Sequence, residues 1–394
     1  MLQRLLGEER LLFRLGGIIV NDLAPGERAS WKEYRLDNKG IWDWVAWEAL
    51  THESVLRNKD DSVLGVIRYK PFVQQKGEKI DLPAFSKGWV MNIEEQHGEA
   101  GEACFLTLTW NPFLNLKGDR VENALGENSS ITIEAMEQHM FSILDLLASR
   151  FPSQAQAQIL KYQEIIDYLA FSLAHGRLYV EMPAVPVDLD SLLTQDFSAD
   201  FSKNLITFGE ETFLVLTLPA FLGCMEETLR RIVEEMTRTG IPCRHVQRIL
   251  FFGEKEARKE MERRDRMGLW CNSRKYIKEL IEAPLHGKFH GYYNNTLVAL
   301  VKTEDYARTV AYLRKLFYET QEFYIIENFN AKQRWWGTIP AHFRAGIAAP
   351  ICAFQSVEEL LRASGKDKEE EMETETLISV DEDEQGREED HVSA

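Results

Sequence analysis

The chain has 394 residues, 44% of them hydrophobic, which predicts a substantial core divided between two domains or contained in one large one. Its formal net charge of −17 disfavours nonspecific nucleic-acid binding as the main task, because such binding depends on a positive surface. The charge is uneven, since residues 366–394 hold thirteen acidic and three basic side chains, a net −10 that leaves −7 for the rest. We therefore expect 364–394 to be a disordered acidic tail.

The cysteines and the apolar runs predict a cytoplasmic protein. The five cysteines are scattered and form no C-x-x-C pair, which is typical of buried thiols in a reducing compartment. No run of eighteen apolar residues occurs, so we expect no membrane-spanning helix, although the chain can still lie against a membrane complex.

The first half predicts an N-terminal arm over residues 1–60, followed by an α/β subdomain over 61–186. β-rich runs predict strands in the subdomain at 62–69, 88–94 and 103–110, with a polar turn at 95–102 between the last two. Two helices are expected after them. Apolar residues at helical spacing predict one over 133–147. Ser153 and Gln156 match a capping box that would open the next, and Gly176 would end it.

Residues 187–363 predict a second, ferredoxin-like subdomain. Its runs follow the order β-α-β-β-α-β once a charged helical insert at 254–284 is set aside. The runs are 212–218, 225–236, 243–252, 292–301, 303–317 and 323–329. The fold class predicted for the whole chain is α+β (α/β), with mixed, mainly antiparallel sheets packed with helices and a split βαβ second half.

Motifs for nucleotide and metal chemistry are missing from the sequence. No G-x-x-x-x-G-K-[ST] run occurs, and the nearest match, Ser364-Gly-Lys-Asp367, lacks the first glycine and the hydroxyl residue. The short histidine and cysteine pairs, His286 with His290 and Cys243 with His245, have no further ligands at a recognisable spacing. We therefore predict no catalytic residue, no cofactor and no metal.

Protein recognition is the task that the remaining features favour. Tryptophans crowd the end of the arm and the segment before Pro340, and basic residues cluster in the insert, where acid-first pairs such as Glu260 with Arg264 favour a solvated helix over a phosphate-binding one. The predicted protein interface consists of Trp42, Trp44, Trp47, Arg263, Arg264, Arg266, Trp335 and Trp336.

Several segments, taken in order, resemble the N-terminal region of the CagE/TrbE/VirB family, the motor ATPases of type IV secretion and conjugation. The similar segments are 88–94, 104–110, 167–173, 185–193, 212–219, 224–229, 246–263 and 291–302. Trp336-Gly-Thr-Ile-Pro340 stands where the family typically has a turn before its motor domain. The resemblance covers most of residues 60–355, and the order and spacing of its short motifs carry it.

The resemblance implies a role but no catalytic residue. In the family a RecA-like domain with Walker A and B motifs follows this region, and these 394 residues contain neither motif. The family's N-terminal region contacts inner-membrane subunits of the channel and helps the motor to assemble. We therefore expect a non-catalytic docking component at the inner face of the bacterial inner membrane, whose partners are inner-membrane and motor subunits and which could also form a homo-oligomer.

Two alternatives remain open. The chain could be one half of a split ATPase that is active only with a separate motor subunit. It could instead guide DNA along the basic helix of the insert, which the acidic body disfavours.

Overall fold

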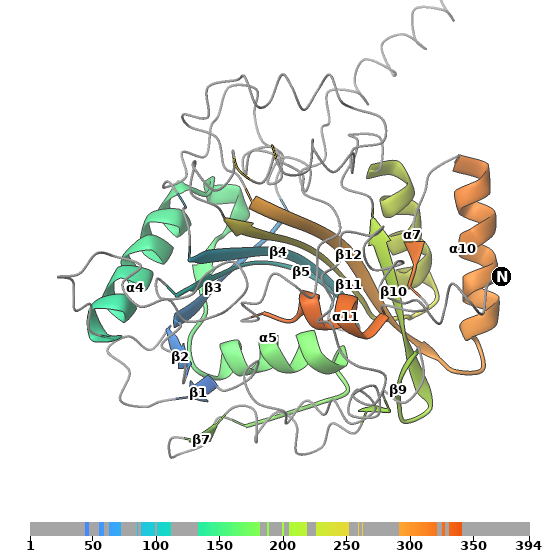
Figure 1. Ribbon diagram of the computed structural model, residues 1–394, viewed down its shortest axis with the longest axis horizontal. Coiled ribbons are helices and arrows are strands. Elements are labelled where there is room, and N and C mark those ends of the chain that lie inside the picture. The colour runs from blue at the N-terminus through green and yellow to red at the C-terminus, as the bar shows by residue number, and fades with distance from the viewer. Residues whose placement is uncertain are drawn as a thin grey trace, which may run out of the picture.

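The computed structural model describes residues 44–46, 55–58, 63–71, 85, 88–98, 101–111, 133–181, 187–188, 199–200, 205–218, 226–251, 259, 262, 291–320, 325–327 and 331–340. This part of the chain forms an α+β fold, which confirms the predicted class (Figure 1). No helix within it is long and apolar enough to cross a membrane.

The strands belong to one sheet, and every strand pairing in the described part is antiparallel. The sheet follows the order β7-β1-β2-β3-β5-β4-β11-β12-β10-β9-β8, while β13 also pairs with β10 and β6 with β3. The strands are β1 (Trp44–Ala46), β2 (Leu56–Asn58), β3 (Val63–Tyr69), β4 (Trp89–Gly98), β5 (Gly101–Trp110), β6 (Gln158–Ile159), β7 (Val187–Asp188), β8 (Ala199–Asp200), β9 (Ile206–Phe208), β10 (Glu211–Leu218), β11 (Cys243–Phe251), β12 (Gly291–Lys302) and β13 (Ile325–Ile326).

The second half has the predicted ferredoxin-like order. Strand β10 leads through α7 (Glu226–Arg238) to β11, and β12 leads through α10 (Tyr306–Thr320) to β13. In the sheet these four strands lie as β11-β12-β10-β13, so the first strand of the unit is central and the last lies beside it. This is the arrangement of a split βαβ unit.

The two halves are joined through the sheet. Strand β4 of the first half pairs with β11 of the second over eight residue pairs, from Cys243 opposite His97 to Leu250 opposite Val90. The boundaries at residues 60, 186 and 363 stay predictions. The pairing of β4 with β11 shows that the two predicted subdomains share one continuous sheet.

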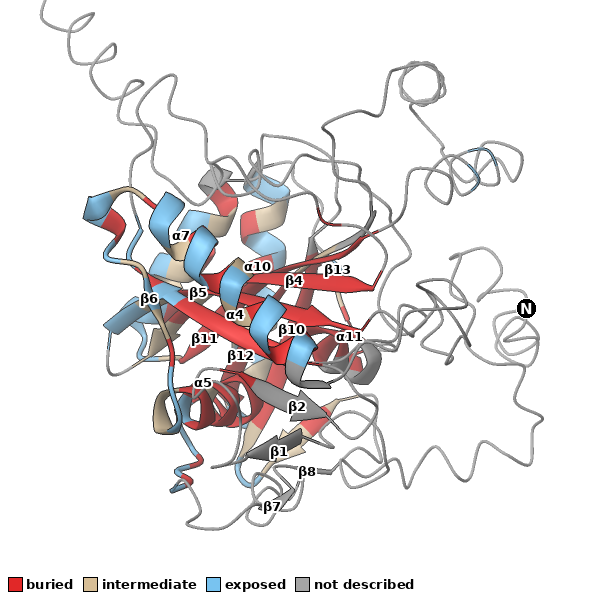
Figure 2. Ribbon diagram, turned by 90° about the vertical axis from the view of Figure 1, so that its left-hand side faces the viewer, coloured by how far each residue is buried: buried red, intermediate tan, exposed pale blue. Residues whose placement is uncertain are grey.

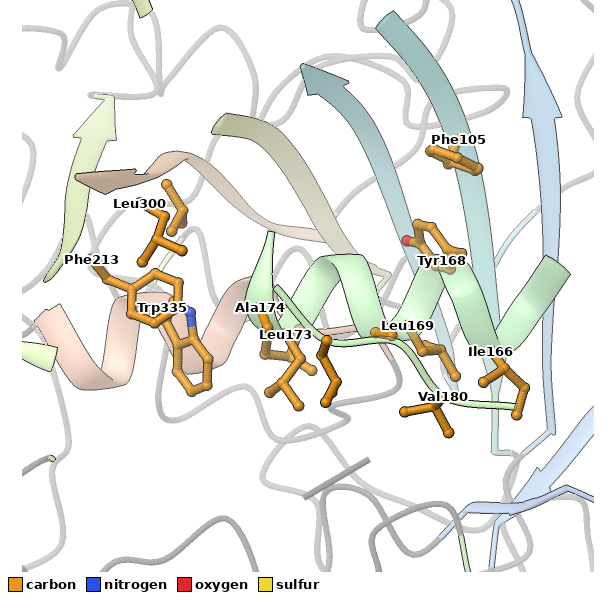
Figure 3. Close-up of a cluster of buried hydrophobic side chains, with 14 of the residues drawn as sticks. Phe105, Ile166, Tyr168, Leu169, Leu173, Ala174, Val180, Phe213, Leu300 and Trp335 are labelled. Atoms are coloured by element: carbon orange, nitrogen blue, oxygen red, sulfur yellow. The ribbon is translucent and has the colours of Figure 1, made fainter. Parts of the chain in front are cut away.

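Helices cover both faces of the sheet (Figures 1 and 2). On one face lie α4 (Ile133–Arg150), α7 and α10, whose apolar side chains pack against residues such as Ile93 and Leu216 in two clusters. On the other face lie α5 (Gln163–Ala174) and α11 (Ala331–Thr338), which form a third cluster with residues such as Phe105 and Phe213 (Figure 3). Successive residues of each strand contribute to opposite faces, because their side chains point alternately to the two sides of the sheet.

Close packing explains one glycine of β3. A Cβ atom at Gly65 would overlap the end of the Leu144 side chain on α4, so a larger residue at this position would force Leu144 to move.

The structure differs from the sequence prediction at the turn expected over 95–102. Strands β4 and β5 continue to Gly98 and Gly101, so most of that segment is paired strand. Its polar side chains are stabilised there by partners on neighbouring elements, which a single-sequence pattern does not reveal.

The predicted capping box is wrong. Ser153 begins a single turn of 3-10 helix, η1 (Ser153–Ala155), that has no side-chain cap and ends where Gln156 adopts a left-handed φ of 47°. The chain then pairs with β3 as β6, and α5 begins only at Gln163. Pairing with the sheet therefore prevails over the local helix-start signal. The predicted helix end is close to the observed one, since α5 stops just before His175 and Gly176.

Candidate functional site: the exit clamp

Two buried arginines of β11 project from the sheet toward α5 and α11. Arg244 and Arg248 are four residues apart on the strand, so their side chains lie on the same face. Arg244 is fully buried and Arg248 is 5% exposed. Because a buried charge is costly unless it is paired, the partners of these guanidinium groups define what the site does.

Arg244 joins three parts of the chain. Its Nη1 lies 3.2 Å from Oε1 of Glu94 on β4, a fully buried ion pair. The same nitrogen donates to the carbonyl oxygen of Thr338 at 3.3 Å, and Nη2 donates to the Thr338 hydroxyl. One guanidinium thus connects β11, β4 and the last residue of α11.

The carboxylate of Glu94 is also bound by neutral donors. Gln96 Nε2 donates to Oε1 at 2.9 Å, the Tyr168 hydroxyl to Oε2 at 3.1 Å and the Ser172 hydroxyl to Oε1 at 3.3 Å. Burial, together with the charge of Glu94, raises the pKa of Tyr168, which keeps its hydroxyl protonated. The acceptor positions of Glu94 are therefore engaged in holding β4, α5 and Arg244 together, so proton abstraction is not a natural role for it.

Arg248 binds the end of α11. Its Nη1 donates to the carbonyl oxygens of Gly337 and Ile339, at 2.9 and 3.5 Å. The last carbonyls of a helix have no partner within the helix and carry partial negative charge, so a cation is favourable there. Burial lowers the pKa of Arg248 to about 9, and this interaction offsets part of the cost of burying the charge.

A second ion pair holds the middle of α11. Arg334 Nε donates to Glu327 Oε1 at 3.1 Å, and the Thr217 hydroxyl of β10 donates to the same oxygen at 2.6 Å. Burial lowers the pKa of Arg334, and the charge of Glu327 opposes that effect. The helix is thus bound at its middle to β10 and the residue after β13, and at its last residues to β11.

We name this set of residues the exit clamp: Glu94, Arg244, Arg248, Glu327, Arg334 and Thr338. It holds α11 and the turn to Pro340 against the centre of the sheet. Between its two ends the indole of Trp335 is buried, with its ring 5.5 Å from that of Phe213 (Figure 3). The arrangement positions the chain where it leaves the sheet, and every charged member has a partner.

Of the side chains in the predicted interface, the structure describes that of Trp335 alone. The side chain of Trp335 is completely buried, so the structure gives it a role in the core in place of the predicted role at an interface. The backbone of Trp44 lies in β1, opposite Asn58 of β2. Beyond the described residues lie Trp42, Trp47, Arg263, Arg264 and Arg266, and the side chain of Trp336.

The sequence patterns did not predict the residues of the exit clamp as a site. Arg244 and Arg248 lie in a segment predicted to be a strand, and two charges on the same face of a strand expected to be buried were the available signal. Their partners are distant in sequence, since Arg244 and Thr338 are 94 residues apart. Only the tertiary structure identifies them.

Comparisons with known proteins identify no family. No protein-family model matches the chain, and no curated protein matches it either. Among solved structures, berberine bridge enzyme from Eschscholzia californica is similar at 9% identity and a TM-score of 0.26, over 66% of this chain and 40% of that one. Two variants of berberine bridge enzyme, one in complex with (S)-reticuline and one described as a reticuline dehydrogenase, reach TM-scores of 0.27 and 0.29 at 9% identity. Each of these matches covers 73% of this chain and 51% of the variant, and a likeness at this level supports no statement about activity.

Proposed function

We propose that this chain is a non-catalytic docking component of a type IV secretion or conjugative transfer machine, which holds a motor subunit near inner-membrane subunits of the channel. The resemblance of residues 60–355 to the N-terminal region of the CagE/TrbE/VirB motors supports the proposal. The structural observation that supports it most is the exit clamp.

The exit clamp suits a docking role because it orients the segment that resembles the joint to the family's motor domain. That segment ends at Pro340, and Arg248 binds the carbonyl oxygens of Gly337 and Ile339 just before it. A partner bound at this point would keep a fixed orientation relative to the sheet. A segment that is already held in one conformation also loses less conformational entropy on binding than one that must first become ordered.

The proposal is tested with the purified full chain and a separate motor chain that carries a Walker A motif, such as one encoded by a neighbouring gene. We expect the chain alone to show no saturable, Mg-dependent ATP hydrolysis and to bind the motor chain directly in calorimetry. Arg248→Met should weaken that binding, because the end of α11 loses its anchor. Arg230→Met, which removes an exposed arginine of α7, is the matched control and should bind like the wild type.

Mg-dependent hydrolysis by the chain alone would contradict the proposal, and so would the absence of binding to motor and inner-membrane subunits. An increase in ATP turnover when the two chains are mixed would favour the split-ATPase alternative instead.

A further inference from the structure

We draw no further inference here: the strongest candidate, the buried side-chain cluster in which Asn92 of β4 lies opposite Arg248 of β11 in the register of the two strands, belongs to the exit clamp already described, where Arg248 binds the carbonyl oxygens of Gly337 and Ile339.

Discussion

His175 shows how a single residue can be committed to the core in one protonation state. It follows the last turn of α5 with a left-handed φ of 50°, and its ring packs against those of Phe171 and Phe213. Its Nε2 donates to the carbonyl oxygen of Val298 at 3.1 Å, the tautomer that a carbonyl acceptor requires. Burial, and then the charge of Arg244, lowers the pKa of His175 from 6.5 to about 3.

This pKa shift predicts a loss of stability in acid. Between pH 6.5 and about 3 the unfolded chain binds a proton at this histidine and the folded chain does not, so the free energy of unfolding falls as the pH falls. The contribution is at most about 1.4 kcal/mol per pH unit in that window. Asparagine tolerates the left-handed conformation, so His175→Asn should give a flatter acid limb when urea unfolding is measured against pH.

The control is the difference in the free energy of unfolding between the wild type and His175→Asn above pH 6.5. His175 is neutral there in both the folded and the unfolded chain, so this difference reports packing alone. Equal slopes below pH 6.5 would show that His175 does not cause the acid sensitivity.

At the scale of one element, α11 is held by buried charged side chains as well as by its apolar side. Arg244→Met leaves the fully buried Glu94 without its cation, and we expect it to destabilise the fold by about 3–5 kcal/mol in denaturant unfolding. Hydrogen exchange of the α11 amides should rise together with that loss, since Thr338 is released.

The double variant Glu94→Gln with Arg244→Met separates the ion pair from packing. Because it removes both charges, its loss of stability should be smaller than the sum of the two single losses. Arg230→Met is the control for an exposed pair and should cost less than about 1 kcal/mol. Additive losses would show that Arg244 and Glu94 do not act as a pair.

At the scale of the whole molecule, the pairing of β4 with β11 makes the two halves one structural unit. Eight residue pairs and the ion pair between Glu94 and Arg244 cross this boundary, and helices cover both faces of the two strands. The cluster under α7 and α10 belongs to the second half alone, whereas the cluster around α5 and α11 draws residues from both halves, so the sheet and this shared cluster couple the two halves.

We accordingly expect the amides of β5 and those of β12 to exchange hydrogen through the same opening event at increasing denaturant. Native-state hydrogen exchange measures the two free energies, which should converge on one value. The comparison uses the peptides of each half whose amides exchange most slowly. Two distinct limiting free energies would show that the halves unfold independently despite the shared sheet.

Much of this fold was predictable because its signals are local. The strands around 63–69 and 243–251, the helix around 226–238 and the order of the second half all follow from the spacing of apolar residues, which is a short-range property. The turn at 95–102 and the capping box at Ser153 failed for the opposite reason, since contacts with distant strands decided both. The resemblance to secretion motors likewise depends on the order of local motifs and stays a prediction.

The sequence by itself determined the class of the fold, the composition of the core and the acidic balance of the chain. The tertiary structure alone decided which polar residues meet. Arg244 finds Glu94 150 residues earlier and Thr338 94 residues later, and His245 meets Glu95 only because β4 and β11 pair in one register. Buried charges are stable only beside their partners, and the register of a sheet joins residues that no spacing along the chain connects.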